Sequence, residues 1–476
     1  MSYDKEILSR FIVDCQKAGL IGKDDYVLSA VSGGPDSMSL LDLLNRWKNK
    51  DGGFSLAVCH FNHQLRAEAD SEQCLVEDFC CANSIRFIGG SSDVDKSEEC
   101  RIMGVHAAAR ELRYRFLSET VEKIKSEIDK PVNVIIATGH HRDDQVETVL
   151  MRLFQGSGLD GLAGIRRIET WHEPFPVKII RPLLNFSRSE LEDYVQSRKI
   201  VTANDLSNLD ITYPRNHIRH NLLPVIRKSF GEEALSGIIR SSEQAQMVSE
   251  VVQYQFEKAL NNCLILRRDN EIVLDYSAFS SYLLMIRLKL LLYSAQSVVG
   301  KYQRISLERC RKADQYLRAR KTGAIEIGGG IKAQLSDRRI YLYYALPQIR
   351  GELLGVDESR TIPGVGKLEV IAHSIKEVKL PPKTGSQFID LDKTGSGLFI
   401  IRSAQPGDRI NPVGMKGRRK VSDILRENGV PPHKREYPVV EINGKIAVIP
   451  PFRIDSEYRL TDDTTLVAEF RLTFKE

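Results

Sequence analysis

The chain has 476 residues, of which 42% are hydrophobic and 28% are charged, with a formal net charge of +5. This composition is ordinary for a soluble globular protein with two to four domains. No apolar run approaches membrane-spanning length and the first residues are polar, so we expect a cytoplasmic protein without membrane contact. The eight cysteines include no Cys-x-x-Cys pair, so neither a zinc ribbon nor a dithiol motif is visible.

Short apolar runs alternate with longer helical patterns through about residues 25–200. We expect strands at 26–31, 54–61, 85–89, 132–138 and 177–180, and helices near 36–48, 68–83, 103–126, 143–155 and 187–198. This alternation predicts an α/β fold, a doubly wound parallel sheet with helices on both faces. Ligands bind such sheets beyond the carboxyl ends of the strands, so polar residues there are the candidates for a site.

The first predicted strand runs directly into Ser-Gly-Gly-Pro-Asp-Ser at residues 32–37. Gly33 and Gly34 let the backbone approach a charged group, and the amides of the turn and of the next helix form an anion site. The carboxylate of Asp36 would repel a bare phosphate, which suggests a bridging cation such as Mg²⁺. The loop is not a Walker A sequence and resembles the pyrophosphate loop (PP-loop) of the ATP pyrophosphatases. The predicted phosphate-binding residues are Ser32, Gly33, Gly34, Pro35, Asp36 and Ser37.

The second predicted strand ends in His-Phe-Asn-His-Gln-Leu-Arg at residues 60–66. Histidines, amides and an arginine at one strand end favour recognition of a nucleotide or an anionic group, although a plain polar loop would look similar. Further along, Arg110 and Arg113 share one face of the predicted helix 103–126. An arginine pair can clamp phosphates, and a solvated arginine face is the alternative.

The fourth predicted strand ends in Gly-His-His-Arg-Asp-Asp-Gln-Val-Glu-Thr at residues 139–148. Asp144 and Glu147 are three residues apart, so they project on the helix face opposite the apolar residues, with His140 one turn earlier. Carboxylates near a helix N-terminus are also favoured by the helix dipole, so simple capping is the alternative. The neighbouring phosphate loop favours an acid–base or metal-binding role.

We expect four parts in the chain: 1–215 as the nucleotide-binding domain, 216–345 as a mainly helical middle domain, 346–385 as a linker or small β element, and 386–476 as a small α+β domain. Asn443-Gly444 in the last part is typical of a tight hairpin turn.

Basic residues gather in the run Lys-Gly-Arg-Arg-Lys at 416–420, near Arg409. Arg215 and Arg219 are four residues apart and share a helix face. Such clusters can bind a phosphate backbone, and solvated surface remains the alternative.

In the order and spacing of its motifs the chain resembles the tRNA(Ile)-lysidine synthetases of the PP-loop superfamily, in their long form. The resemblance covers nearly the whole chain, with Ala67 where the family usually has Gly. It implies a sheet of the adenine nucleotide α-hydrolase-like type and C-terminal tRNA-binding domains. The segments that carry it are 32–37, 60–66, 109–116, 139–148, 151–153, 156–165, 181–184, 205–208, 215–219 and 406–409.

The resemblance implies ligation of L-lysine to C2 of the wobble cytidine of a tRNA(Ile) with a CAU anticodon, which changes codon recognition from AUG to AUA. The base would be adenylated by ATP, with pyrophosphate leaving into the loop 32–37 and Mg²⁺ near Asp36. The ε-amine of lysine would then displace AMP. The family also hints at a homodimer.

The residue assignments follow from the same resemblance. The catalytic candidates are Asp36, Arg110, Arg113, His140, Asp144 and Glu147. The expected ATP-binding residues are 32–37 together with His60 and Asn62. The residues expected to bind tRNA are Arg66, Arg215, Arg219, Arg409, Lys416, Arg418, Arg419 and Lys420.

Three other classes of protein compete with this interpretation. A PP-loop tRNA thiolase acting on an anticodon-loop base usually needs a reactive cysteine pair or ligands for a cluster. This chain has no Cys-x-x-Cys pair, and Cys80 and Cys81 lie within an apparently amphipathic helix. A synthetase acting on a small metabolite would not need the basic C-terminal part. A tRNA-binding protein that has lost catalysis would not keep competent residues at every motif position.

Overall fold

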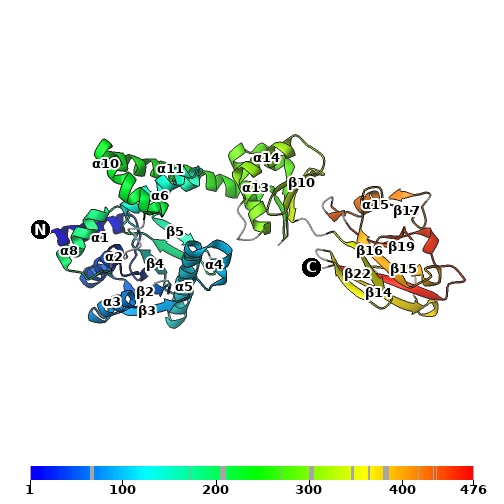
Figure 1. The fold of residues 1–476 in the computed structure, drawn as a ribbon, viewed down its shortest axis with the longest axis horizontal. Coiled ribbons are helices and arrows are strands. Elements are labelled where there is room, and N and C mark those ends of the chain that lie inside the picture. Colours follow the sequence, from blue (N-terminus) through cyan, green and yellow to red (C-terminus); the bar gives the residue numbers. More distant parts are fainter. Residues whose placement is uncertain are drawn as a thin grey trace. The chain divides into compact units, whose positions relative to one another are not determined.

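A computed structural model describes residues 2–64, 69–172, 174–203, 211–268, 270–299, 305–344, 348–362, 365–378, 385–415, 417–431, 434–435 and 437–474. The chain divides into two compact units, Met1–Tyr254 and Gln255–Glu476 (Figure 1). Among the described helices, none combines the length and the apolar character that a membrane span needs.

The first unit contains a six-stranded sheet in the order β3-β2-β1-β4-β6-β5. The strands are β1 (Tyr26–Ala30), β2 (Ser55–Asn62), β3 (Arg86–Ser91), β4 (Val134–Thr138), β5 (Ile168–Trp171) and β6 (Val177–Ile180). All are parallel except β5, which pairs antiparallel with β6 and was not predicted. The predicted α/β fold is confirmed. Because strand order reverses at the central pair β1 and β4, the crevice beyond their carboxyl ends is the expected ligand site.

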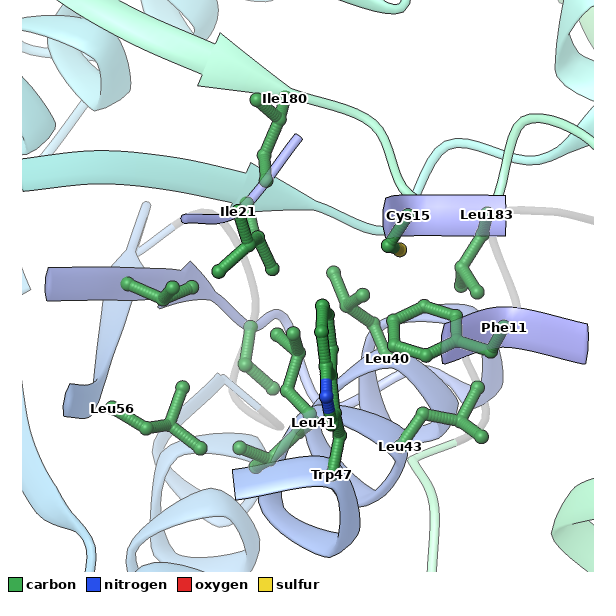
Figure 2. Packing of buried hydrophobic residues seen from close by; sticks show 14 of the residues in the cluster. Phe11, Cys15, Ile21, Leu40, Leu41, Leu43, Trp47, Leu56, Ile180 and Leu183 are labelled. Carbon is green, nitrogen blue, oxygen red and sulfur yellow. The ribbon is translucent and has the colours of Figure 1, made fainter. Parts of the chain in front are cut away.

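Helices cover both faces of this sheet, and each face has its own apolar core. The helices around the sheet are α1 (Tyr3–Lys17), α2 (Pro35–Trp47), α3 (Ala69–Ala82), α4 (Glu98–Met103), α5 (Val105–Glu127), α6 (Arg142–Phe154), α7 (Leu159–Leu162) and α8 (Arg188–Arg198). On one face, Leu40 and Trp47 of α2 pack with Phe11 of α1 (Figure 2). On the other, Leu117 of α5 packs with Ile136 of β4. Burial on both faces fixes the loop between β1 and α2.

The helices after residue 213 continue the first unit. They are α9 (Pro214–His217), the π-helical turn η3 (Ile218–Leu222), α10 (Leu223–Phe230) and α11 (Glu232–Cys263), whose residues from Gln255 onward belong to the second unit. Ile218, Leu223 and Leu235 bury against Val146 and Leu150 of α6. This contact explains why the compact unit runs to Tyr254, past the boundary expected at residue 215.

The second unit begins with a mixed segment of helices and strands. Its sheet has the order β7-β8-β11-β10-β9, of which β7 and β8 were not predicted. The elements are β7 (Leu264–Arg268), β8 (Glu271–Asp275), α12 (Tyr276–Ser281), α13 (Leu284–Val299), α14 (Leu307–Arg318), β9 (Ala324–Gly328), β10 (Ile331–Ser336) and β11 (Arg339–Tyr344).

The C-terminal part of the second unit has two sheets around one core, β12-β16-β19-β20-β21 and β13-β14-β22-β15. The strands are β12 (Arg350–Gly355), β13 (Ser359–Ile362), β14 (Gly366–Ser374), β15 (Ser386–Asp390), β16 (Leu398–Ser403), β19 (Pro438–Ile442), β20 (Lys445–Ile449), β21 (Arg453–Ile454) and β22 (Leu466–Phe474). Residues 346–385, expected as a linker or a small β element, contain strands: β12 pairs with β16 and β14 pairs with β22, because Leu354, Leu368 and Val370 bury in the shared core. A two-stranded ribbon, β17 (Arg409–Ile410) and β18 (Arg419–Lys420), precedes α15 (Val421–Glu427).

Candidate active site

The loop 31–34 between β1 and α2 is held in shape by its own serines. Gly33 has a φ of +92°, which favours glycine, and its carbonyl accepts the Ala203 N–H at 2.9 Å. Ser37 Oγ donates to the Gly34 carbonyl at 2.9 Å and accepts the Ser32 N–H at 3.2 Å. The Ser37 hydroxyl thus fixes the loop, at the N-terminus of α2 where backbone amides favour an anion.

The end of β4 packs directly on this loop. A Cβ atom at Gly139 would lie 3.1 Å from the Ser37 backbone nitrogen and Cα atom. A side chain at this position would push the Ser37 backbone aside by a few tenths of an ångström, because the neighbouring atoms are backbone and not a flexible side chain. The 139–148 motif and the phosphate loop are therefore parts of one site.

His141 links the two motifs, and sequence reasoning favoured its neighbour His140 instead. The His141 side chain is 1% exposed, with Nε2 at 3.5 Å from Asp36 Oδ2 and 3.6 Å from Asp144 Oδ2. Burial lowers its pKa, but hydrogen bonding to Asp36 and the charges of Asp144 and Asp143 outweigh burial, so the pKa is raised overall. The structure therefore favours an imidazolium beside the phosphate loop.

His140 has the opposite electrostatic character. Its Nδ1 lies 3.0 Å from Thr138 Oγ1. Burial lowers its pKa; Asp144 raises it, while Arg181 and Arg113 lower it further. His140 is therefore neutral near pH 7, and its pKa of about 3 makes it a weak proton acceptor.

Asp144 and Glu147 are both engaged by arginines from the helices after residue 213. Arg215 donates to Asp144 Oδ1 and to Glu147 Oε2, each at 2.7 Å. Arg219 donates to Glu147 Oε1 at 2.6 Å and Oε2 at 3.0 Å. Burial alone would raise the pKa of Asp144, but His141 and Arg215 lower it to about 2. The structure thus joins residues assigned separately to catalysis and to tRNA, and both carboxylates accept charge-assisted hydrogen bonds from arginines.

The two arginines of α5 lie in different surroundings. Arg110 is exposed and stacks over Tyr114 at 4.6 Å and over Trp171 at 6.0 Å. Arg113 is half-buried with its guanidinium 5.4 Å from the Tyr114 ring, and its pKa is lowered by burial. Because Arg113 also lowers the pKa of His140, it lies in the electrostatic field of the site.

The candidate nucleotide residues on β2 are buried and hydrogen-bonded. His60 Nδ1 lies 2.9 Å from the Val31 carbonyl, and burial lowers the pKa of His60. Asn62 donates to Asp70 Oδ1 and accepts the Gln64 N–H, each at 2.9 Å. These contacts position the loops after β1 and β2. Arg66 lies outside the described residues.

The donor set at Asp36 suits a cation shared with phosphates. Oδ1 of Asp36 is shielded from solvent and has no hydrogen-bond partner among the described residues. The described part of the chain holds no group of three His, Cys, Asp or Glu side chains arranged for a metal ion. Mg²⁺ in nucleotide sites commonly takes one or two carboxylates plus substrate phosphates, and one orphaned carboxylate oxygen fits that pattern.

The basic residues of the C-terminal part lie on and beside the ribbon β17–β18. Arg409 and Lys420 are exposed and directly opposite each other in the ladder, and Arg418 is exposed next to them. Arg419 is instead ion-paired with Glu427. Lys416 lies outside the described residues.

Comparison with known proteins identifies two domains and several full-length relatives. Residues 7–226 match the family model "PP-loop domain", and residues 399–470 match "TilS substrate C-terminal domain". The tRNA(Ile)-lysidine synthase of Clostridium perfringens is 30% identical, and that of Clostridium tetani is 29% identical, each over 96% of both chains. A solved structure of the U34-tRNA thiolase NcsA from Methanococcus maripaludis is 17% identical, covering 51% of this chain and 79% of that one, with a TM-score of 0.40.

The full-length matches include both the PP-loop region and the C-terminal region of this chain. Together with the site at the β1–β4 switch point, they show that the chain belongs to the tRNA(Ile)-lysidine synthase family.

Proposed function

We propose that this chain converts the wobble cytidine of a CAU-anticodon tRNA(Ile) into lysidine, using ATP and L-lysine and releasing AMP and pyrophosphate. The supporting observation is the junction of the two motifs: Asp36 of the phosphate loop lies within 3.5 Å of His141, and His141 lies within 3.6 Å of Asp144. A nucleotide on the loop would thus have its α-phosphate side facing a cluster of acid–base groups.

In the first step, O2 of the cytidine attacks the α-phosphorus of ATP and the bond to pyrophosphate breaks. The amides of residues 32–37 and the α2 N-terminus would hold the leaving pyrophosphate. Protonated His141 would add a positive charge where negative charge develops. Asp36 would hold Mg²⁺ through its orphaned Oδ1 oxygen. Bound there, Mg²⁺ would neutralise phosphate charge.

In the second step, the ε-amine of lysine attacks C2 of the adenylated base and AMP leaves. The amine must first lose a proton. His140 is neutral and could accept a hydrogen bond from the amine, but burial lowers its pKa to about 3, which makes it too weak a base to take the proton itself. Asp144 and Glu147 are committed to arginines. Asp144 and Glu147 would instead hold Arg215 and Arg219 beside the centre, where the arginines can meet the tRNA or the adenylate.

The buried cysteines do not suit the thiolase alternative. Burial raises the pKa of Cys15 and of Cys80 to about 12, and it raises the pKa of Cys59 as well. Buried thiols with raised pKa values supply little thiolate, the form that attacks and binds metals. The full-length relatives are tRNA(Ile)-lysidine synthases, which also favours lysidine formation over thiolation.

The direct test is incorporation of labelled lysine into a tRNA(Ile) transcript by the full chain. We expect acid-precipitable label that requires ATP, Mg²⁺ and the wobble cytidine. A transcript with uridine at that position is the control. ATP turnover to AMP without lysine transfer would contradict the proposal and point to another nucleophile.

A further inference from the structure

An open pocket of about 300 Å³ lies beside the basic ribbon of the C-terminal part. It is formed by the turn after β17, by the start of β21 and by one residue of β15. The lining residues are Gln387, Val413, Gly414, Met415, Phe452, Arg453 and Ile454. This volume is at the low end of the range for ligand pockets, about 300–1,000 Å³, so the pocket suits one small group rather than a large cofactor.

The pocket is held in shape by contacts within the domain. The Val413 N–H donates to the Ile454 carbonyl at 3.2 Å, and the Asn411 N–H donates to Asp455 Oδ2 at 2.8 Å. Buried Tyr437 packs behind Phe452 with ring centroids 5.5 Å apart. The turn is thus tied to β21, and the phenyl ring is supported on one side. A preformed pocket loses little conformational entropy when a ligand enters.

The lining of the pocket combines apolar and polar surface in equal parts. Val413 and Met415 are 42% and 36% exposed, which is unusual for apolar side chains gathered around a pocket. The amide nitrogen of Gln387 donates to the Pro451 carbonyl at 2.7 Å, which leaves its oxygen as an acceptor, and Arg453 adds guanidinium donors. A nucleobase offers this combination of a flat apolar face and hydrogen-bonding edges.

The charges around the pocket suit the phosphates that accompany a base. The ribbon carries Arg409 and Lys420 as exposed cations, with Arg418 beside it. Arg419 reaches Met415 of the pocket rim, with Nη1 at 3.8 Å from the sulfur. Cations that track a backbone next to an aromatic pocket are typical of single-stranded nucleic-acid sites.

We propose that this pocket receives one unstacked nucleobase of the tRNA outside the anticodon loop, while the ribbon cations hold the adjacent phosphates. This inference rests on the proposed function, because it assumes that tRNA is the substrate. The C-terminal part would then recognise the base of one exposed nucleotide in addition to binding phosphates electrostatically.

The test is chemical footprinting of tRNA(Ile) bound to the full chain, with dimethyl sulfate and a carbodiimide as base-reactive probes. The double variant Val413→Asn/Met415→Asn makes the pocket polar without changing charge. The matched control is Leu353→Asn/Leu398→Asn, two exposed apolar residues of the same unit away from the pocket lining.

We expect one base outside the anticodon loop that is protected by the wild type and by the control, and exposed with the pocket variant. We also expect the pocket variant to bind tRNA about tenfold more weakly. The slope of log affinity against log salt concentration should not change, because the variant removes no positive charge. Identical footprints for the three proteins, or no protected base outside the anticodon loop, would overturn the inference. Wild-type protein that forms no lysidine would instead contradict the proposed function, so the two failures are distinguishable.

Discussion

The adjacent histidines His140 and His141 differ in their contacts and in the direction of their pKa shifts. His141 is the N-cap of α6, where its backbone N–H donates to Asp144 Oδ2 at 3.0 Å and its ring turns toward Asp36. His140 contacts Thr138 instead. The sequence showed that this segment holds acid–base groups, but it could not assign the two rings, because their directions depend on the backbone angles where β4 meets α6. The same folding brings Arg181 near His140, a residue that charge patterning gave no reason to single out.

The raised pKa of His141 predicts a pH-dependent contribution to stability. Protonated His141 stabilises the folded state fully below its ordinary pKa of 6.5, and this contribution is lost as the pH rises through the raised pKa. The difference in free energy of unfolding between the wild type and His141→Gln should therefore shrink as the pH rises above about 6.5. Urea unfolding at several pH values measures it. A difference that grows with pH would show that the pKa is lowered instead.

The close approach of Gly139 to the phosphate loop predicts a strong effect of one methyl group. Gly139→Ala places a carbon 3.1 Å from the Ser37 backbone, so the loop must shift. We expect kcat/KM for ATP to fall by roughly 10-fold, because the loop must give by a few tenths of an ångström and a displacement of about 1 Å at a reacting centre can cost about 100-fold. Gly237→Ala is the control, because its added carbon would meet only Arg240 Nη2, at 3.8 Å. Equal kinetics for the two variants would mean that the loop tolerates the displacement.

At the scale of elements, an ion-pair network joins α6 to α9 and η3. Glu147 of α6 is fully buried and contacts Arg215 of α9 and Arg219 of η3. The helices could be predicted from the sequence because the spacing of their apolar residues repeats within a window of about 10 to 20 residues. The network could not, because its partners are separated by 68 to 75 residues and the sequence does not show which helix packs on α6. The strands β1 and β4 could also be predicted from local sequence, because they are short runs of buried, mostly apolar residues. The edge strand β5 could not, because it is half-exposed and its sequence has no clear apolar pattern.

The network predicts a large coupling between its members. Arg219→Gln leaves a buried carboxylate short of a partner and should destabilise the fold by about 3 kcal/mol. The double variant Glu147→Gln/Arg219→Gln should cost less than the sum of the single variants, with a coupling of about 1–3 kcal/mol in denaturant unfolding. The exposed pair Glu122 and Lys125 serves as the comparison and should couple by less than about 1 kcal/mol. Additivity at both pairs would exclude a cooperative network.

At the scale of the whole molecule, the near-balanced net charge of +5 hides a local basic surface on the C-terminal part. Exposed Arg409 and Arg418 are free to meet phosphates, whereas Arg419 is committed to Glu427. Charge counting could not separate these arginines, because it does not show which of them already have a carboxylate partner.

This distinction predicts different salt effects for neighbouring arginines. Arg418→Ala and Arg409→Ala should each weaken tRNA binding and lower the slope of log affinity against log salt by about 1. Arg419→Ala should change the slope less, and ATP binding should be unaffected in all three. Filter binding over a salt series measures the slopes. A slope that changes most for Arg419 would contradict the assignment.

The central claim is that the phosphate loop and the 139–148 motif together adenylate the tRNA base before lysine arrives. The most direct measurement uses ATP labelled at the α-phosphate, the full chain and tRNA(Ile), with lysine omitted. We predict label bound covalently to the tRNA, released as AMP when lysine is added, and absent with His141→Gln. A wild-type enzyme that attaches lysine but never carries label on the tRNA, even in rapid-quench experiments, would contradict the account.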